Sequence, residues 1–216
     1  PPYRYSPAVN EDMKKHIEVL LDAGMITPGK GPWAFPVVMV KKPGGKHWRM
    51  CIDYRKLNQL TEKDKHPLPR IQDIHHALRG ANFFSTMDAH SGYYQVVVHP
   101  EDRSKTAFIS KHGLFEWNVM PMGLSNAPAT FQRFMEAALA DVRHKYCLVY
   151  IDDVITYSKT FKDHVSHLRE VFLRLRAHSV TLKPRKCSFG MNHVKHLGFI
   201  CSCKGITSDP AKVKVI

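Results

Sequence analysis

The sequence predicts an α+β fold in which a mainly antiparallel sheet packs on helices. β-Rich and helical runs alternate irregularly, neighbouring β-rich runs are joined as hairpins, and no repeated βαβ unit is evident. The chain has 216 residues, 44% of them hydrophobic, so it is long enough to bury a core as one large domain or two small ones.

The elements of the first half follow from periodicity and turn residues. A helix is expected from Asn10, its cap, to Gly24, its stop, because apolar residues recur between them at helical spacing. Residues 35 to 54 predict a long hairpin around a Pro-Gly-Gly turn. Further expected elements are a helix over 68 to 78, a strand over 82 to 88, and strand-like runs around 93 to 98, 106 to 110 and 114 to 120.

The second half is expected to begin with a helix from Asn126 to Val142, opened by Asn126 and Pro128. The run "LVYIDDVITYS", residues 148 to 158, reads as one buried β-strand run. Apolar residues between Val165 and Leu175 predict another helix, and short strands are expected near 187 to 191 and 194 to 201.

Charge and cysteine usage narrow the functional class. Thirty-two Lys and Arg against nineteen Asp and Glu give a formal charge of +13, which favours a polyanionic partner such as nucleic acid over a merely basic globular protein. The five cysteines show no disulfide-framework spacing, which is typical of a reducing compartment. Neither a secretory signal nor a membrane span is indicated, and the abrupt ends suggest a segment of a longer chain.

Two adjacent acids, Asp152 and Asp153, interrupt the apolar run over residues 148 to 158, which is unusual for a buried strand. Burying two like charges is costly unless a cation compensates. They are expected at the tip of a tight hairpin, and Asp88, at the end of a strand-like run, is expected to lie beside them. Clustered carboxylates suit Mg²⁺, and two such ions support phosphoryl transfer. The alternative is that the pair is simply a solvated turn.

Five motifs in order carry a family resemblance: "WRMCIDYRKLN", "MDAHSGYYQV", "MPMGLSNAPATFQ", "YIDDV" and "HLGFICSCKGI". Together they resemble the reverse transcriptase of gypsy-type LTR retrotransposons and, more distantly, of retroviruses, over essentially the whole chain. The resemblance implies a right-hand polymerase fold. It implies a fingers region over 1 to 63 and 95 to 126 and a palm region over 64 to 94 and 127 to 205. Residues 206 to 216 would begin the connection to a missing thumb. The reverse transcriptase domain as a whole is expected to span about 35 to 205.

The resemblance also implies roles for charged residues. Asp88, Asp152 and Asp153 match the metal-binding catalytic acids, with the backbone carbonyl of Ala89 as a further candidate ligand. Lys186 matches a lysine that protonates the leaving pyrophosphate. On the basic hairpin, Lys42 and Arg49 match residues that hold the incoming triphosphate, and cationic side chains suit phosphates. The alternative for the last two is an exposed, solvated hairpin.

Residues around the nucleotide are assigned in the same way. Tyr93 matches the aromatic residue that packs under the deoxyribose and excludes a 2′-hydroxyl; without the family it is an ordinary β-surface or core aromatic. Met122 and Gly123 match a segment that contacts the nucleotide, although retroviral enzymes usually carry Gln before this glycine. Residues expected to contact template or primer are Gln132, Tyr150, Ile151, Leu197 and Gly198, the last two in the primer-grip motif "HLGF".

The implied activity is RNA-directed DNA polymerisation. Expected partners are two Mg²⁺ ions, with Mn²⁺ as a substitute, dNTPs, a primed RNA or DNA template, and protease, ribonuclease H and integrase domains of a polyprotein. The expected location is the cytoplasm, in virus-like particles, with no membrane partner. Alternatives are a non-catalytic nucleic-acid-binding remnant and an RNA-templated RNA polymerase. A zinc site is the remaining alternative, formed by Cys187, His193, His196, Cys201 and Cys203.

Overall fold

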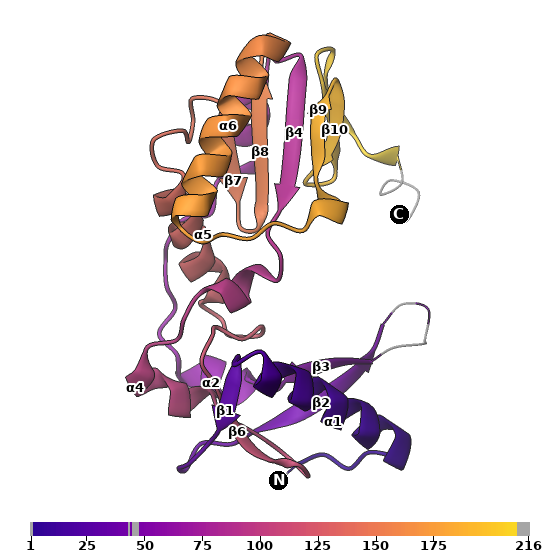
Figure 1. Ribbon diagram of the computed structural model, residues 1–216, viewed down its shortest axis with the longest axis vertical. Helices are drawn as coiled ribbons and strands as arrows, with labels where there is room; N and C mark the ends of the chain where they lie inside the picture. The colour runs from indigo at the N-terminus through magenta and orange to yellow at the C-terminus, as the bar shows by residue number, and fades with distance from the viewer. Residues whose placement is uncertain (1, 43, 45–47, 211–216) are drawn as a thin grey trace. The chain divides into compact units, whose positions relative to one another are not determined.

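A computed structural model describes residues 2–42, 44 and 48–210, and the chain forms two compact units (Figure 1). Unit 1 comprises Pro1–Asp64 and Tyr93–Ala127, and unit 2 comprises Lys65–Gly92 and Pro128–Ile216. The three divisions lie within two residues of the boundaries expected at 63/64, 94/95 and 126/127. The assignment of these units as fingers and palm stays a prediction.

Unit 1 is built on a five-stranded sheet of order β1-β6-β5-β2-β3, in which only β2 and β5 run parallel. Its long β2–β3 hairpin confirms the one predicted over 35 to 54, although Pro43 and Gly45 of the expected turn lie outside the described residues. The elements of this unit are α1 (Pro7–Asp22), β1 (Ile26–Pro28), β2 (Phe35–Lys41), β3 (Trp48–Ile52), α2 (Arg55–Leu60), α4 (Pro100–Arg103), η2 (Ser104–Thr106), β5 (Phe108–Ser110) and β6 (Gly113–Trp117).

The core of unit 1 lies between α1 and the sheet. Met13 and Ile17, one helical turn apart on α1, are buried with the aromatic residues of the sheet. Tyr54 is also buried, and its hydroxyl donates to the Thr106 carbonyl over 2.7 Å. The buried Tyr54 hydroxyl therefore has a hydrogen-bond acceptor within the apolar cluster of unit 1.

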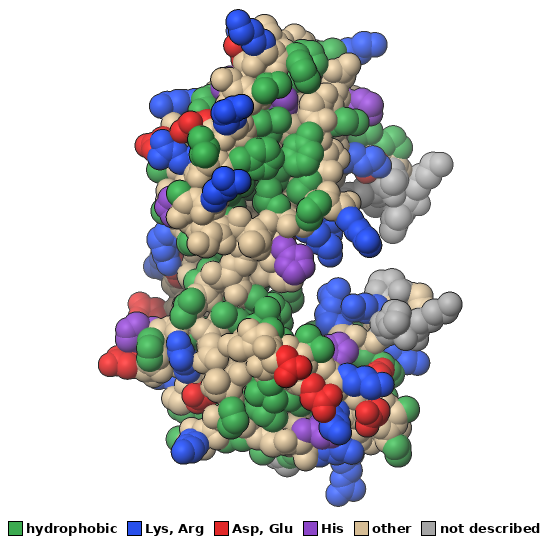
Figure 2. Space-filling view, viewed as in Figure 1, with side chains coloured by type: hydrophobic (Ala, Val, Ile, Leu, Met, Phe, Trp, Pro, Cys, Tyr) green, Lys and Arg blue, Asp and Glu red, His purple; other side chains and the backbone are tan. Residues whose placement is uncertain are grey.

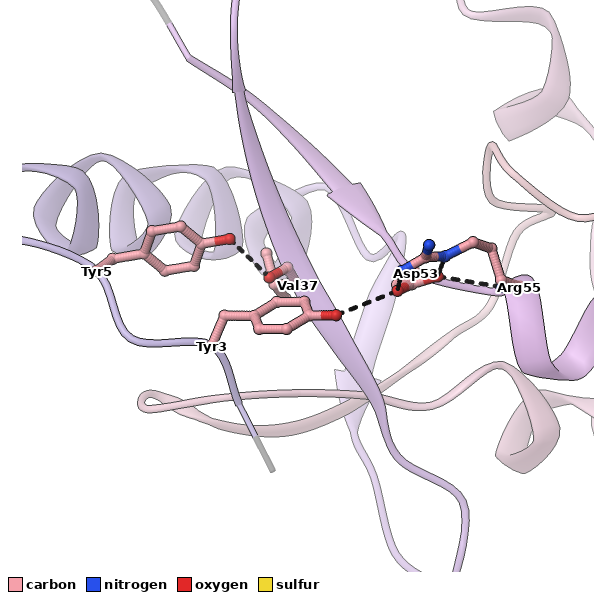
Figure 3. A network of polar contacts seen from close by, with 5 residues as sticks. All are labelled: Tyr3, Tyr5, Val37, Asp53 and Arg55. Carbon is pink, nitrogen blue, oxygen red and sulfur yellow. Dashed lines mark hydrogen bonds and ion pairs between the residues drawn. The ribbon is translucent and has the colours of Figure 1, made fainter.

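Two tyrosines of the N-terminal segment bind the β2–β3 region: Tyr5 contacts β2, and Tyr3 contacts Asp53, directly after β3 (Figure 3). β5 pairs with β2 only at Phe35 and Pro36. Beyond that point, the Tyr5 hydroxyl donates to the Val37 carbonyl and accepts from the Met39 N–H, each over 3.1 Å. One phenol thus occupies two backbone positions that a longer β5 would have paired.

Unit 2 is built on the antiparallel sheet β7-β8-β4-β9. Helix α6 packs on β8 and β4, and Figure 1 shows it running alongside β8. A separate three-stranded antiparallel sheet, β10-β11-β12, follows. The elements are α3 (Ile71–Ala77), β4 (Phe83–Asp88), α5 (Ala127–Ala138), β7 (Cys147–Tyr150), β8 (Asp153–Ser158), α6 (Phe161–Ala177), η3 (Pro184–Lys186), β9 (Ser188–Met191), β10 (His193–His196), β11 (Phe199–Ser202) and β12 (Gly205–Ser208).

A buried polar chain fastens α6 to the sheet. Thr160 caps the helix by accepting from the Asp163 N–H. His164, fully buried, has its two ring nitrogens 2.7 Å from Ser85 Oγ on β4 and 3.0 Å from Ser158 Oγ on β8. The helix is therefore tied to the two central strands by side chains as well as by apolar packing.

Four sequence-based expectations need correction. Helix α1 begins at Pro7 rather than Asn10, because proline suits the first helical position and Ser6 stands before it. Helix α5 ends at Ala138, earlier than Val142. The run 93 to 98 starts as a 3₁₀ turn, η1 (Gly92–Gln95), because Tyr94 stacks on Trp117. The boundary expected at 205/206 cuts through β12, which pairs with β11.

Among the described residues, no helix is both long and apolar enough to span a membrane.

Candidate active site

Two acids far apart in sequence face each other on neighbouring strands. β4 ends at Asp88 and β8 begins at Asp153, and the antiparallel register places these two residues directly opposite each other. Asp152 precedes Asp153 in the turn between β7 and β8. The expected convergence of the three acids on one end of the sheet is confirmed, because β4 and β8 are neighbours there.

The hairpin turn sits one residue earlier than expected. Tyr150 pairs with Asp153, so the two turn residues are Ile151 and Asp152 rather than the two acids. Ile151 has a φ of +55°, in the left-handed region that β-branched residues disfavour. Asp152 therefore lies in the turn, while Asp153 belongs to the strand.

Charge is concentrated at this end of the sheet. Burial, then the nearby charges of Asp152 and Asp88, raises the pKa of Asp153 to about 6. Lys186, at the end of η3, places its ammonium 2.8 Å from Asp88 Oδ2. That hydrogen bond raises the pKa of Lys186, so the lysine keeps its proton and is the cation beside the acids.

The donor set suits a hard divalent cation that shares its coordination with a substrate. Within residues 2–42, 44 and 48–210, no group of three or more His, Cys, Asp or Glu is arranged to hold a metal by itself. Mg²⁺ typically takes one or two carboxylates and completes its shell with water and phosphates. Burial first, and then the charges of Asp152 and Asp88, raise the pKa of Asp153, so a bound cation would stabilise its ionised form; Asp88, Asp152 and Asp153 are the residues that would hold one.

The backbone around the acids is also tied together. The Ala89 N–H donates to the Asp152 carbonyl over 3.2 Å, and the Lys183 N–H donates to the Asp88 carbonyl over 2.9 Å. Ala89 is buried, and its role as a carbonyl ligand stays a prediction. These bonds link β4 to the turn and to the segment that carries Lys186.

Gln132 has a setting that differs from the one expected. Its side chain is 0% exposed, and its Oε1 accepts from the Ile151 N–H over 2.6 Å. A buried carboxamide committed to the protein backbone does not reach a template strand, so the expected template contact finds no support here. The sequence carried no signal for this, because a glutamine in an amphipathic helix looks the same whether it faces ligand or protein.

The residues of the expected primer grip form a second tight turn in unit 2. His196 pairs with Phe199, which leaves Leu197 and Gly198 as the turn between β10 and β11, both with positive φ. The Asp209 N–H donates to the Gly198 carbonyl over 3.0 Å. Leu197 and Tyr150 pack against the same apolar cluster of unit 2, so this motif and the end of β7 share a core.

The alternative zinc ligands lie between η3 and β12 of unit 2. Among the described residues, no three of them come together in an arrangement that could hold a metal ion. His196 and Cys201 are buried on neighbouring strands, while Cys203 is exposed. The Cys187 thiol lies 3.3 Å from the Lys183 carbonyl.

Unit 1 carries the expected triphosphate-binding residues. Arg49 is on β3, paired with Val40, and Lys42 directly follows β2; both side chains are exposed. Lys41 lies 5.4 Å from the ring centroid of Trp48, a cation–π contact across the hairpin. Arg49 therefore belongs to the hairpin of the unit 1 sheet, and Lys42 lies next to it.

The remaining expected nucleotide residues also belong to unit 1. Tyr93 lies in η1, and Met122 is 51% exposed. Gly123 has a φ of +98°, which favours glycine, and its carbonyl accepts from Asn58 Nδ2 over 2.8 Å. That hydrogen bond anchors the "MPMG" segment on α2.

This combination of an antiparallel sheet, two acids paired across it and a lysine beside them agrees with the comparison to known families. The family model for reverse transcriptase (RNA-dependent DNA polymerase) matches residues 40–201. The chain belongs to the reverse transcriptase family.

Its similarity to curated proteins fits the gypsy-type resemblance. It is 38% identical over 209 residues, 95% of the chain, to the retrovirus-related Pol polyprotein from transposon 297 of Drosophila melanogaster. It is 38% identical over 213 residues, 96% of the chain, to that from transposon gypsy. The Figwort mosaic virus enzymatic polyprotein is 37% identical over 91% of the chain. The chain spans 20%, 21% and 30% of these proteins, respectively.

Solved structures confirm the predicted polymerase fold. The chain superimposes over its full length on 29% of the foamy viral protease-reverse transcriptase in complex with an RNA/DNA hybrid, with a TM-score of 0.89 and 24% identity. The complex of that protein's dRH form with double-stranded DNA gives the same TM-score over 38% of its chain. At this identity the likeness establishes the fold.

Proposed function

We propose that this chain is the polymerase part of a retrotransposon polyprotein, an RNA-directed DNA polymerase that extends a primer with dNTPs. The observation that carries the proposal is the pairing of Asp88 with Asp153 beside the turn residue Asp152, with protonated Lys186 on Asp88. Carboxylates gathered at one end of a sheet, with raised pKa at one of them, suit divalent cations and phosphates.

In the proposed reaction the 3′-oxygen of the primer attacks the α-phosphorus of the dNTP. A P–O bond forms to the primer, the bond to pyrophosphate breaks, and the hydroxyl proton passes to solvent water. Two Mg²⁺ ions, or Mn²⁺ in their place, held by Asp88, Asp152 and Asp153 would stabilise the attacking and leaving oxygens. Lys186 keeps its proton beside Asp88, which makes it a donor for the leaving pyrophosphate.

Unit 1 carries further residues that we propose to bind the nucleotide. Exposed Lys42 and Arg49 would bind the triphosphate, because an ammonium and a bidentate guanidinium both suit phosphate oxygens. Tyr93 would exclude a 2′-hydroxyl, with Met122 and Gly123 lining the nucleotide. In unit 2, the carbonyl of Ala89 would add a metal ligand beside the acids.

The proposed polymer partners are a primed RNA or DNA template. Figure 2 shows Lys and Arg side chains on the surface of both units, in keeping with the net charge of +13. Such a surface neutralises phosphates without reading sequence. Tyr150, Ile151, Leu197 and Gly198 would hold the primer end. Protease, ribonuclease H and integrase domains are the proposed neighbours in the polyprotein, and virus-like particles in the cytoplasm the proposed location.

Incorporation on a primed RNA template tests the function directly. With Mg²⁺, we expect extension with dNTPs and not with rNTPs. Asp152→Asn should lower the rate at least about a hundredfold, because charge on the transferred phosphoryl group would lose stabilisation. Asp141→Asn is the matched control, since Asp141 is an exposed acid of the same unit that pairs with Arg174; it should leave extension unchanged.

Each other outcome identifies a different function. Binding of the primed template without extension would favour the non-catalytic remnant, and extension with rNTPs alone would favour an RNA-templated RNA polymerase. Full activity of Asp152→Asn would refute the metal role of that residue. Tyr93→Ala should admit rNTPs, and continued rejection of rNTPs would refute the role of Tyr93 as the steric gate.

A further inference from the structure

The turn that carries Asp152 has a conformation that its own sequence disfavours. Ile151 has a φ of +55°, where a β-branched residue is an outlier. Of the two turn residues only Ile151 has a positive φ, and two-residue hairpin turns of that pattern prefer glycine at the first position, where this chain has isoleucine. A strained residue persists only when the surrounding structure fixes it, so contacts from outside the hairpin must hold this turn.

Two such contacts are present, one at each turn residue. The Ile151 N–H donates to Gln132 Oε1 over 2.6 Å. The Ala89 N–H, at the end of β4, donates to the Asp152 carbonyl over 3.2 Å. The second bond joins the turn to the strand that carries Asp88, and the first joins it to α5.

The carboxamide of Gln132 is itself held in one orientation. Its Nε2 donates to Glu136 Oε1 over 2.8 Å and to the Val149 carbonyl over 3.3 Å. Glu136 lies one helical turn further along α5, and Arg143 pairs with it at 2.6 Å. Because Nε2 faces two acceptors, Oε1 is left to face the Ile151 amide. The side chain of Gln132 is 0% exposed, so solvent does not compete for these bonds.

We propose that Gln132 is a positioning residue for the metal-binding turn: its carboxamide, oriented by Glu136, holds Ile151 left-handed and so fixes the direction of the Asp152 and Asp153 carboxylates. The inference rests on the proposed function, because it assigns those carboxylates to a divalent cation. Partners that orient metal ligands commonly change metal affinity or activity by about 10- to 100-fold when they are lost.

Two substitutions separate the parts of this role. Gln132→Met keeps a similar volume and removes all three hydrogen bonds. Gln132→Glu keeps an acceptor for Ile151 but turns the donor into an oxygen that faces Glu136. Mn²⁺ binding to the protein alone, followed by electron paramagnetic resonance, should weaken by about 10- to 100-fold in both variants. The Mg²⁺ concentration for half-maximal extension should rise by a similar factor, while KM for dNTP stays unchanged.

The backbone argument has its own test, since asparagine tolerates the left-handed conformation. In an Ile151→Asn background, Gln132→Met should weaken Mn²⁺ binding by a smaller factor than it does in the wild type. Gln72→Met is the matched control, because Gln72 is an exposed glutamine on α3 of the same unit; it should leave Mn²⁺ binding unchanged.

The outcomes distinguish this inference from the proposed function. A Gln132→Met protein that melts at lower temperature yet binds Mn²⁺ as the wild type does would show a purely structural role and overturn the inference. Equal losses in the Ile151 and Ile151→Asn backgrounds would overturn the backbone argument. A wild-type protein that neither extends primers nor binds Mn²⁺ would instead refute the proposed function itself.

Discussion

Replacing Asp153 with Asn should stabilise the metal-free protein at pH 8, although the same change removes a proposed metal ligand. Burial, then Asp152 and Asp88, raises the pKa of Asp153 from 3.8 to about 6, against the opposing effect of Lys186. The folded state therefore binds more protons than the unfolded state between about pH 4 and pH 6. Stability falls as the pH rises through that window and stays low above it.

The expected change in the free energy of unfolding follows from the pKa shift of Asp153 and from the partial exposure of its side chain. A change from 3.8 to about 6 corresponds to about 3 kcal/mol if it is fully expressed. The side chain is only partly buried, and solvent screening reduces this to about 1 kcal/mol. Asn is isosteric and uncharged, so Asp153→Asn should recover about 1 kcal/mol at pH 8, and less towards pH 4, where the wild-type carboxyl is protonated in the fold.

Urea unfolding in EDTA at pH 8 and pH 4 measures this difference. Added Mg²⁺ should then stabilise the wild type and not the variant, because binding to the native state alone adds stability. Asp141→Asn, which changes an exposed acid paired with Arg174, should give no gain at either pH. An Asp153→Asn protein less stable than the wild type at pH 8 in EDTA would refute the reasoning.

Two further predictions concern stability. Tyr5→Phe should cost about 1–2 kcal/mol in urea unfolding, because it leaves the Val37 carbonyl and the Met39 N–H without their partner. Tyr3→Phe, which loses one 3.3 Å contact to Asp53, should cost less, and equal costs would contradict the β2 contact. Burial, then His167, lowers the pKa of His164 in the folded state, so the unfolded chain takes up a proton first and stability falls as the pH falls below about 6.5. The stability lost between pH 7.5 and pH 5.5 should be smaller in His164→Gln, and an unchanged loss would exclude His164 as the titrating group.

Local patterns along the chain were sufficient to find most elements of the fold. The β2–β3 hairpin, the strand ending at Asp88 and helix α6 all follow from apolar periodicity, which reports directly which face of an element is buried. The errors lie where tertiary contacts override local preference. Tyr94 turns towards Trp117, and the stretch from Gly92 to Gln95 becomes a 3₁₀ turn rather than a strand.

The acids of the site also show which features local patterns predict and which depend on tertiary contacts. Their unusual placement in an apolar run, together with the ordered motifs, was enough to select Asp88, Asp152 and Asp153 and to predict their convergence. The position of the turn was missed by one residue, because a left-handed Ile151 contradicts every local rule for hairpin turns. The contacts that hold the turn come from outside the hairpin: the Ile151 N–H donates to Gln132, and the Ala89 N–H donates to the Asp152 carbonyl.

By itself, the sequence determined the family, the α+β class and the identity of the clustered acids, since composition, periodicity and motif order are properties of the chain. Only the tertiary structure decided that Gln132 accepts a hydrogen bond from the Ile151 backbone N–H and that Lys186 contacts Asp88. The physical reason is that hydrogen bonds and ion pairs depend on distances of about 3 Å between residues far apart in sequence, and no local pattern encodes such distances.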